Sequence, residues 1–415
     1  MKRLGLIGNP LGHSWSPEIH RFFIKQDYNL FPLQEDELDA FLKAKEFDGI
    51  NVTIPYKETV IPYLDELDEN AKAIGAVNCI VNDNGILKGY NTDYLGFKQM
   101  LLANDVPVSE GKIAILGTGG ARKACEKALK DLGANTLIVS RNPDRGITYE
   151  ECIAREKEIS IIVNTTPVGM KPDYEGHPID IKQFSNLRAV VDIVANPIVT
   201  RLQFEAKALG IKYLGGFEML VRQALEADKL FLKKEFSEKL VKDCETEVLK
   251  EKRNIVLIGM PTSGKTTISK CLSEKLGNTL IEMDDELVKE FGTSIQEVFA
   301  KHGEAYFRER ETALAKSLQT KEKSIISCGG GIIKNEENMR YLNQNGVVVW
   351  LDRSVDKLHG TSSRPLSQDD DAIHKLYNER KHLYKKYADI RIENNGTIED
   401  TVNTIVRESS RKVGD

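Results

Sequence analysis

Gly259-Met-Pro-Thr-Ser-Gly-Lys-Thr266 is a G-x-x-x-x-G-K-T sequence with a different pattern on each side. Residues 254–258 are a short apolar run of the buried-strand type, and residues 267–276 carry apolar side chains at helical spacing. A strand, a glycine-rich loop and a helix in this order are the context in which such a loop binds phosphates. The stretch therefore predicts an ATP site built on a phosphate-loop α/β fold.

The groups of this loop have separate expected roles. Lys265 would reach the two outer phosphates, and the hydroxyl of Thr266 can ligate Mg²⁺. The residues expected to surround the nucleotide are Gly259, Ser263, Gly264, Thr266 and Thr267. A glycine-rich turn followed by a chance Lys-Thr pair is the alternative, and the flanking strand and helix argue against it.

The length and composition are those of a globular protein with two or three domains. The chain has 415 residues, of which 40% are apolar and 29% charged, and its net charge is −5. Basic residues are scattered among acidic ones, so nucleic acid is not an expected partner, and no apolar run is long enough for a membrane span. The six cysteines form no C-x-x-C pair, which indicates reduced thiols in a cytoplasmic protein. The composition does not indicate an oligomeric state.

Upstream of this domain, the chain begins with a strand and a second glycine-containing loop. Residues 2–7 form the strand, and the loop that follows ends at Pro17, which can open a helix. The hydroxyls of Ser14 and Ser16, together with free amides at a helix start, suit a carboxylate. A serine that only caps the helix is the plainer alternative.

A lysine follows the next short strand. Residues 51–54 form that strand and Pro55 ends it, so Thr53 and Lys57 lie at its carboxyl end, where open α/β sheets bind ligands. If Lys57 is held against Asp93, it becomes an oriented proton donor. Without this partner it would be an ordinary solvated lysine.

Four motifs in this region resemble those of shikimate dehydrogenase. They are G-x-S-x-S-P around Ser14, N-V-T-x-P-x-K ending at Lys57, G-A-V-N ending at Asn78, and N-T-D-x-x-G around Asp93. The resemblance implies that Ser14 and Ser16 hold the carboxylate of the substrate, and that Thr53, Asn78 and Asp93 hold its ring hydroxyls. It also implies that Lys57 and Asp93 are the catalytic pair. Cys79 departs from the threonine that is usual in the family.

The following segment has the pattern of a dinucleotide lobe. After a buried strand at residues 112–116, Gly117-Thr-Gly-Gly-Ala121 opens a helix. Arg122 replaces the third glycine of G-x-G-x-x-G, but the sequence matches the G-x-G-G-A-x-x-A of shikimate dehydrogenases. The resemblance implies cofactor contacts at Gly117, Gly119, Gly120 and Ala121. Past the next strand, Arg141 and Arg145 occupy the place where an arginine accommodates the 2′-phosphate, so NADP is favoured over NAD.

The rest of the dehydrogenase pattern runs to about residue 240. Residues 161–170 resemble the loop beside the nicotinamide, which implies a cofactor contact at Met170. Ala195 stands where the family usually has a tyrosine near the substrate. Gly215, a further expected cofactor contact, opens a long helix, and Gln223 matches the substrate-binding glutamine of the family. We expect the helix over 219–240 to return to the first lobe. The mostly charged stretch 233–253 is expected to be a solvated helix or a linker, and we place the linker at 241–252.

The segment from 253 to 415 resembles shikimate kinase in five motifs that follow the phosphate loop in order. They are Thr279–Asp284, Tyr306–Glu311, Ser327–Gly331, Ser363–Leu366 and Glu379–Tyr384. The first of these is an expected strand that delivers Glu282 and Asp284 to one face. Taken singly, each motif could be a turn, a surface loop or a solvated helix.

The resemblance to shikimate kinase implies roles for the polar residues of these motifs. Arg308 and Arg380 would bind the carboxylate of shikimate, and Glu311 would orient Arg308. Asp284 would accept the proton of the attacking hydroxyl, and Arg364, on a lid, would neutralise the transferring phosphoryl group. The remaining expected contacts are the substrate-pocket amides of Gly329, Gly330 and Gly331 and the Mg²⁺ ligand Glu282. Glu282 replaces an aspartate of the family, the lid is short, and Gly360 replaces a lid arginine.

The sequence thus predicts an α/β protein with three parts. An α/β substrate lobe (1–90, completed by helix 219–240) and a Rossmann-type NADP lobe (91–218) precede a P-loop kinase domain with a central parallel sheet (253–415). The implied function is reduction of 3-dehydroshikimate with NADPH, followed by phosphorylation of shikimate by ATP and Mg²⁺. Three alternatives stay open: a dehydrogenase that prefers quinate and NAD, a kinase for another small polyol, and a nucleotide-binding regulatory module in place of the kinase.

Overall fold

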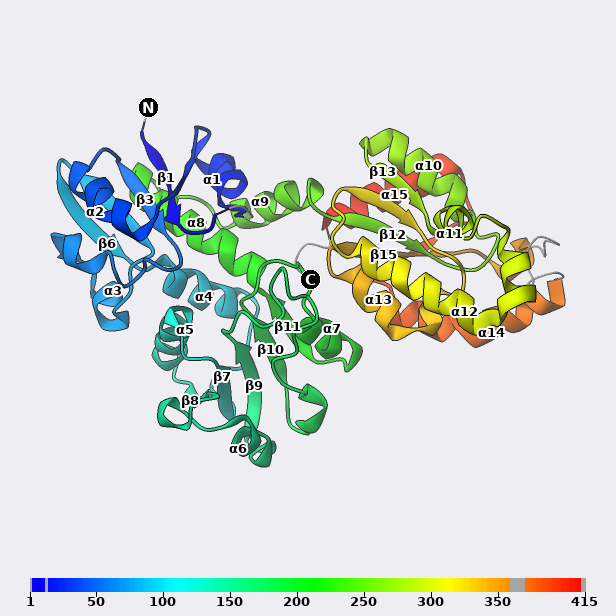
Figure 1. The fold of residues 1–415 in the computed structure, drawn as a ribbon, viewed down its shortest axis with the longest axis horizontal. Coiled ribbons are helices and arrows are strands. Elements are labelled where there is room, and N and C mark those ends of the chain that lie inside the picture. The colour runs from blue at the N-terminus through cyan, green and yellow to red at the C-terminus, as the bar shows by residue number, and fades with distance from the viewer. Residues whose placement is uncertain (1, 12–13, 359–369, 412–415) are drawn as a thin grey trace. The chain divides into compact units, whose positions relative to one another are not determined.

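A computed structural model of the chain describes residues 2–11, 14–358 and 370–411 (Figure 1). The chain divides into two compact units, residues 1–248 and 249–415. The first unit contains two sheets and the second contains one. No helix in these ranges is apolar over a length that would cross a bilayer.

The first sheet of unit 1 has six strands with mixed directions. In spatial order they are β2 (Asn29–Pro32), β1 (Leu4–Gly8), β3 (Gly49–Val52), β5 (Cys79–Asp83), β6 (Ile86–Tyr90) and β4 (Glu66–Leu67). Strand β1 is parallel to β2 and β3, whereas β5 pairs antiparallel with β3 and with β6. Because β1 and β3 are parallel neighbours, their carboxyl ends lie at the same sheet edge, and the loops that carry Ser14 and Lys57 both leave from there.

Three helices belong to this first sheet. They are α1 (Ser16–Ile24), α2 (Glu35–Ala44) and α3 (Glu69–Ile74). Pro17 lies in the first turn of α1, as the sequence predicted, and Asp68 caps α3 by accepting from the amides of Asn70 and Ala71. The core beneath α2 is apolar and includes Leu38, Leu42 and Ile50.

The second sheet of unit 1 has five strands, all parallel. In spatial order they are β11 (Lys212–Gly215), β10 (Ala189–Asp192), β9 (Ile159–Asn164), β7 (Lys112–Leu116) and β8 (Asn135–Val139). The helices of this part of the chain are α4 (Thr92–Ala103), α5 (Gly120–Asp131), α6 (Tyr149–Ala154), α7 (Arg201–Ala208) and α8 (Gly216–Leu232). Strand β9 is buried at every position, as expected when both faces of a parallel sheet are covered. The Rossmann-type arrangement predicted from the sequence is confirmed.

Helix α8 connects the two sheets of unit 1. It begins directly after β11 and packs against α1, α4 and β5 as well as β11 (Figure 1). A methyl group added at Gly96 of α4 would lie 2.7 Å from the backbone nitrogen of Gln223, so the glycine permits close approach of α4 and α8. The long helix therefore returns to the first lobe, as predicted, because it packs against α1 and β5.

The predicted boundaries of this helix and of the linker after it were wrong. Helix α8 ends at Leu232, where Lys233 adopts a left-handed conformation with φ 52°, and so does not extend to 240. Residues 241–252 are not an extended linker, because α9 covers Lys239–Lys250. The reason is a stripe of apolar residues at helical spacing, all buried, which the charged composition concealed: Val241, Cys244, Val248 and Leu249.

Unit 2 is built on a five-stranded parallel sheet. In spatial order its strands are β13 (Thr279–Glu282), β14 (Ser324–Ser327), β12 (Asn254–Ile258), β15 (Gly346–Asp352) and β16 (Ile390–Glu393). Its helices are α10 (Lys265–Leu276), α11 (Met283–Phe291), α12 (Ile295–Leu318), α13 (Glu336–Asn343), α14 (Asp370–Tyr387) and α15 (Ile398–Arg411). The phosphate loop follows the central strand β12 and leads into α10, so the predicted P-loop domain with a central parallel sheet is confirmed.

Two local features of unit 2 differ from the expected pattern. The strand predicted over residues 279–284 ends at Glu282, and Asp284 lies in the first turn of α11, because the run of acidic residues from Asp284 to Glu286 favours a helix start. Helix α12 contains a break at Gly303, which has φ 80° and ψ 170°. This conformation is accessible to glycine and strained for other residues.

Candidate active sites

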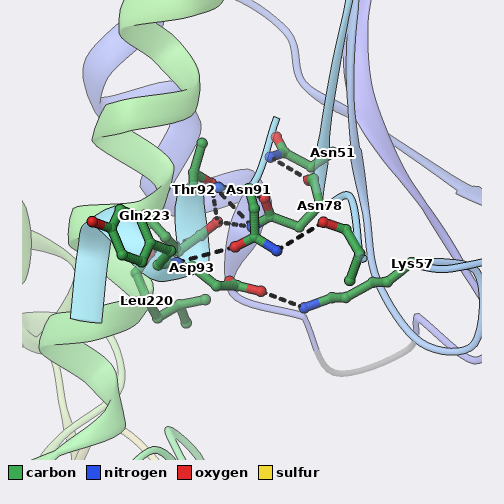
Figure 2. Close-up of polar contacts among 10 residues, drawn as sticks. Asn51, Lys57, Asn78, Asn91, Thr92, Asp93, Leu220 and Gln223 are labelled. Atoms are coloured by element: carbon green, nitrogen blue, oxygen red, sulfur yellow. Dashed lines mark hydrogen bonds and ion pairs between the residues drawn. The ribbon is translucent and has the colours of Figure 1, made fainter. Parts of the chain in front are cut away.

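A lysine–carboxylate pair marks the first site. Lys57 lies in the loop after β3 and Asp93 in the first turn of α4, and Lys57 Nζ is 2.6 Å from Asp93 Oδ2 (Figure 2). Both side chains are mostly buried, with exposed fractions of 22% and 13%. Asn91 caps α4 by accepting a hydrogen bond from the Tyr94 amide, which fixes the turn that carries Asp93. The structure therefore provides the pairing on which the proton-donor role depends.

A cluster of amides and hydroxyls lies beside this pair. Asn78 Nδ2 donates to Thr92 Oγ1 at 3.0 Å and to Gln223 Oε1 at 3.4 Å, and the Thr92 amide donates to Asn78 Oδ1 at 2.6 Å. Gln223 Nε2 donates to the carbonyl of Leu220 on its own helix. Figure 2 shows that the residues of this cluster come from three different parts of unit 1. Such groups can exchange hydrogen bonds with the hydroxyls of a polyol.

The predicted carboxylate-binding residues lie at the adjacent sheet edge. The amide of Ser16, the first residue of α1, donates to Ser14 Oγ at 3.2 Å. The amide of Thr53 donates to the carbonyl of Ile7, and Thr53 Cγ2 covers Gly8 so closely that a methyl group there would lie at 2.4 Å. The structure thus places Ser14 on the loop after β1, Ser16 at the start of α1 and Thr53 on the loop after β3.

Sequence reasoning assigned no role to two polar residues of this region. Thr92 lies inside the N-T-D-x-x-G motif, in which only Asp93 was assigned a role. Asn51, the first polar residue of the N-V-T motif, donates from Nδ2 to the carbonyl of Asn78 at 3.2 Å. Both residues could have been predicted, because each has a hydrogen-bonding side chain and lies within a motif already assigned to the site.

A glycine-rich turn after β7 forms the dinucleotide loop. Gly117 has φ 109°, and a methyl group there would lie 2.9 Å from Thr166 Cγ2, so the turn requires glycine. Within the part of the chain that the structure describes, no side chain caps α5 at Gly119, and a methyl group added at Gly119 or Gly120 would meet no atom within 4 Å. Open space in front of uncapped helix amides, including that of Ala121, suits a pyrophosphate.

The other predicted cofactor residues follow neighbouring strands of the same sheet. Arg141 and Arg145 are exposed in the segment after β8, and Met170, which is 41% exposed, lies in the loop after β9. Gly215 ends β11 and precedes α8. Since all strands of this sheet are parallel, these residues lie at its carboxyl edge, as does the glycine turn.

A buried acid joins two of these loops. Asp192, at the end of β10, accepts hydrogen bonds from Asn164 Nδ2 at 3.0 Å and from Thr200 Oγ1 at 2.7 Å. Burial raises the pKa of the Asp192 carboxyl to about 6, although hydrogen bonds from Thr200, the Val194 amide and Asn164 oppose the shift. The loops after β9 and β10 are thereby held together, and the second contains Ala195 in place of the expected tyrosine.

The phosphate loop of unit 2 has the strained backbone that its motif predicts. Gly259, Thr262 and Gly264 have φ values of 151°, 62° and 93°. Lys265 is buried, and its Nζ donates to the carbonyls of Gly259 at 2.9 Å and Met260 at 2.8 Å, so its ammonium group lies across the loop. The Ser263 hydroxyl is buried and has no hydrogen-bond partner among the described residues. A loop of turned amides with a lysine above it fits a polyphosphate.

A hydroxyl and a carboxylate lie next to this loop. Thr266 and Thr267, both exposed, are in the first turn of α10, and Thr266 Oγ1 is 3.5 Å from Glu282 Oε2. Glu282 also accepts a hydrogen bond from Ser269. Two hard oxygen ligands beside a phosphate loop fit Mg²⁺, which usually takes one or two protein ligands and completes its shell with phosphates and water.

The turn at Gly329–Gly331 is where the other predicted kinase residues meet. A methyl group at Gly329 would lie 2.9 Å from Asp284 Oδ1, and one at Gly331 would lie 2.5 Å from a terminal nitrogen of Arg308. Arg380 donates to the carbonyl of Gly330 at 2.9 Å. A methyl group added at Gly330 would lie 2.8 Å from Pro261 of the phosphate loop. Gly329 and Gly331 thus make room for Asp284 and Arg308, and Gly330 makes room for the phosphate loop.

Two acids hold Arg308 in place. Its Nη1 donates to Glu311 at 2.8 Å, while Nε and Nη2 both contact Glu304 at 3.1 Å. Burial raises the pKa of Glu311, and the charge of Arg308 opposes this shift. Glu304 and Tyr384, which donates to the Gly330 carbonyl at 2.6 Å, were missed in the sequence. Each lies one helical turn from an assigned arginine, a spacing that could have indicated them. Arg364 and Gly360 lie outside the described residues.

Family models match both units. The model for the shikimate dehydrogenase substrate binding domain matches residues 6–80, and the shikimate kinase model matches residues 261–410. Among curated relatives, the chain is 38% identical over 259 residues to a shikimate dehydrogenase (NADP(+)) of Clostridium beijerinckii, covering 58% of this chain and 95% of the relative. It is 36% identical over 250 residues to the Bacillus subtilis shikimate dehydrogenase (NADP(+)), covering 54% and 89%.

Solved structures agree with this assignment for unit 1. A chorismate mutase/shikimate 5-dehydrogenase fusion protein from Clostridium acetobutylicum matches with a TM-score of 0.56 and 34% identity, covering 59% of this chain and 96% of that one. Shikimate 5-dehydrogenase from Thermus thermophilus, in complex with NADP(H) and shikimate, matches with a TM-score of 0.55 and 32% identity, covering 60% and 100%. The chain therefore belongs to the shikimate dehydrogenase family through its first unit and carries a shikimate kinase domain in its second.

Proposed function

We propose that the protein catalyses two consecutive reactions, the reduction of 3-dehydroshikimate to shikimate with NADPH and the phosphorylation of shikimate at its 3-hydroxyl with ATP. The observation that carries this proposal is that both units hold groups for one kind of ligand, a carboxylated polyol. Unit 1 has the Lys57–Asp93 pair beside Asn78, and unit 2 has Arg308 and Arg380 at a glycine turn next to a phosphate loop. A cytoplasmic location remains a prediction from the sequence.

In the first reaction, the protein holds the ketone and supplies a proton. NADPH, when bound, supplies the hydride that adds to the carbonyl carbon. Lys57 donates a proton to the carbonyl oxygen as negative charge develops there, and Asp93 orients the ammonium group for this transfer. Asn78 and Gln223 bind ring hydroxyls, and Ser14 and Ser16 bind the carboxylate.

The cofactor and its specificity follow from unit 1 alone. The glycine turn from Gly117 to Gly120 would hold the pyrophosphate, and Arg141 and Arg145 would hold the 2′-phosphate of NADP. Met170, in the loop after β9, would lie beside the nicotinamide. The alternative dehydrogenase, which prefers quinate and NAD, does not require the two arginines.

In the second reaction, the protein positions a hydroxyl for in-line attack on the γ-phosphate of ATP. Asp284 accepts the proton of the 3-hydroxyl, and the guanidinium groups of Arg308 and Arg380 bind the carboxylate. Lys265 neutralises charge on the transferring phosphoryl group, a role that the resemblance to shikimate kinase also implies for Arg364. Thr266 and Glu282 would hold Mg²⁺, which contributes further positive charge at the phosphates.

The test is to incubate the full chain with 3-dehydroshikimate, NADPH and Mg-ATP and to identify the product by mass spectrometry. We expect shikimate 3-phosphate, with one NADP⁺ and one ADP formed per molecule. Omission of ATP should stop the reaction at shikimate. No ADP from added shikimate would favour the regulatory-module alternative, and faster turnover of quinate with NAD would favour the quinate alternative. Phosphorylation of another polyol in preference to shikimate would favour the alternative that unit 2 is a kinase for a different small polyol.

A further inference from the structure

A buried histidine–aspartate pair joins two helices of unit 1. His20 Nδ1 on α1 lies 2.8 Å from Asp228 Oδ1 on α8, and the exposed fractions of the two side chains are 1% and 0%. On the residues that the structure describes, neither His20 Nε2 nor Asp228 Oδ2 has a hydrogen-bond partner in the protein. The pair belongs to neither proposed reaction, so its presence requires a separate explanation.

The surroundings of this pair are those of an apolar core. On α8 the neighbours Ala224, Leu225, Ala227 and Phe231 are all at most 2% exposed, and a leucine at 228 would continue this apolar face. Burial raises the pKa of Asp228, while the adjacent His20 lowers it. A buried polar pair of this kind usually adds less stability than apolar residues of similar volume. Stability alone therefore does not account for Asp228.

The two helices carry proposed substrate-binding residues from opposite sides of the site. Ser16 begins α1, one turn before His20, and Gln223 precedes Asp228 on α8. Gln223 Oε1 accepts a hydrogen bond from Asn78 Nδ2 at 3.4 Å, whereas Ser16 would bind the carboxylate of the substrate. The distance between the two helices therefore sets the distance between the residues that would bind the two sides of one ligand.

A second contact leads from His20 into the amide cluster of Figure 2. The ring of Tyr28 stacks on His20 with centroids 4.0 Å apart and an interplanar angle of 6°. Tyr28 donates from its hydroxyl to Asn51 Oδ1 at 2.8 Å, and Asn51 Nδ2 donates to the carbonyl of Asn78 at 3.2 Å. A shift of His20 would thus also disturb the strand end that presents Asn78.

We propose that Asp228 is a positioning residue of the dehydrogenase site: its hydrogen bond with His20 holds α1 and α8 at the separation at which Ser16 and Gln223 bind one substrate molecule. This inference rests on the proposed dehydrogenase function. It assigns to Asp228 an effect on substrate binding and none on the chemical step, which Lys57 and Asp93 perform.

The test compares Asp228→Leu with Asp228→Asn in the full chain. Leucine fills the space and removes the hydrogen bond, whereas asparagine keeps an oxygen that accepts from His20. We expect Asp228→Leu to raise KM for 3-dehydroshikimate about tenfold, the effect of losing one or two hydrogen bonds, with kcat and KM for NADPH within about twofold. Asp228→Asn should restore KM to within about threefold of the unchanged chain.

The chain offers two internal controls. Glu205→Gln alters a partly buried histidine–carboxylate pair, His177 Nε2 with Glu205 Oε2 at 2.8 Å, on residues outside α1 and α8, and should leave KM for 3-dehydroshikimate unchanged. Phosphorylation of added shikimate by the second unit gives the concentration of each variant protein, and a retained kcat for NADPH oxidation shows that its first unit is folded. An unchanged KM in Asp228→Leu, or Asp228→Asn as impaired as Asp228→Leu, would overturn the inference. Absence of dehydrogenase activity in the unchanged chain would instead overturn the proposed function.

A milder variant covers the case in which Asp228→Leu does not fold. Tyr28→Phe removes only the hydroxyl that contacts Asn51 and keeps the ring stacked on His20. We expect a rise in KM for 3-dehydroshikimate of about threefold to tenfold with kcat retained. Equal loss of kcat and of affinity for both substrates, accompanied by a lower melting temperature, would show a merely structural role.

Discussion

The ammonium group of Lys57 lies 2.6 Å from Asp93 Oδ2, although 36 residues separate the two in the chain. Their pairing could be expected from two short motifs that matched one family in order. No such signal existed for His20 and Asp228, which are 208 residues apart and belong to no common motif. Sequence reasoning therefore located the residues of the motifs, and missed contacts that depend on how α1 and α8 pack.

Replacement of Lys57 should remove the proton donor of the reduction. We expect Lys57→Ala to lower kcat for NADPH oxidation by roughly 10²–10⁴-fold, the usual contribution of a general acid. Lys88→Ala is the matched control, because Lys88 forms an exposed ion pair with Glu66 at 2.9 Å on the same sheet. The rate of NADPH oxidation is followed by the loss of NADPH absorbance. Comparable loss in both variants would contradict the assigned role.

The glycine at 331 should be required for substrate binding by the kinase. A methyl group there would lie 2.5–2.8 Å from three atoms of the Arg308 guanidinium. Since these atoms are the tip of a long side chain, we expect Gly331→Ala to displace Arg308 without unfolding unit 2. KM for shikimate should rise about tenfold, while KM for ATP stays unchanged. Gly396→Ala, where a methyl group meets no atom within 4 Å, is the control. An unchanged KM for shikimate would contradict the prediction.

At the scale of elements, helix α9 shows where composition misleads. Six of the twelve residues of Lys239–Lys250 are charged, and this suggested a linker. The remaining residues include a buried stripe at helical spacing, so the segment packs as a helix. The strand β12 and the helix α10 were predicted correctly because a motif marked the junction between them. At residues 279–284 the predicted strand was too long. The strand ends at Glu282, and the last two residues belong to α11.

Helix α9 also buries an acid whose titration should be measurable. Glu245 is 4% exposed, and burial, with Glu218 adding to it and Arg222 opposing it, raises its pKa to about 8. The folded state therefore binds the proton more tightly than the unfolded state, so Glu245 lowers stability progressively as pH rises from about 4.5 to about 8. We expect Glu245→Gln to stabilise unit 1 at pH 9 by on the order of 2 kcal/mol and to have little effect at pH 4.5.

The measurement for this prediction is urea unfolding of the full chain at the two pH values, with loss of dehydrogenase activity as the signal for unit 1. Glu247→Gln provides the matched control, because Glu247 lies on the exposed side of the same helix. A stabilisation by Glu245→Gln that is equal at both pH values would show that the effect does not come from titration of this carboxyl.

For the whole molecule, two units with separate sites predict two separable activities. Lys57→Ala should leave phosphorylation of added shikimate intact, and Lys265→Ala should leave NADPH oxidation intact while abolishing ADP formation. An equimolar mixture of the two variant proteins should then convert 3-dehydroshikimate to shikimate 3-phosphate, since shikimate can diffuse between molecules. Lys275→Ala on the same helix as Lys265 is the control. A mixture that fails, although each variant keeps its remaining activity, would contradict independent sites.

The seventeen residues of α8 span about 25 Å, and contacts with the α1 segment run along this length, from Trp15 against Phe217 to His20 against Phe231. Ser16 on α1 and Gln223 on α8 would bind the same molecule. A change of preference to a different ring acid should therefore need compensating substitutions on both helices, while KM for NADPH stays within about twofold.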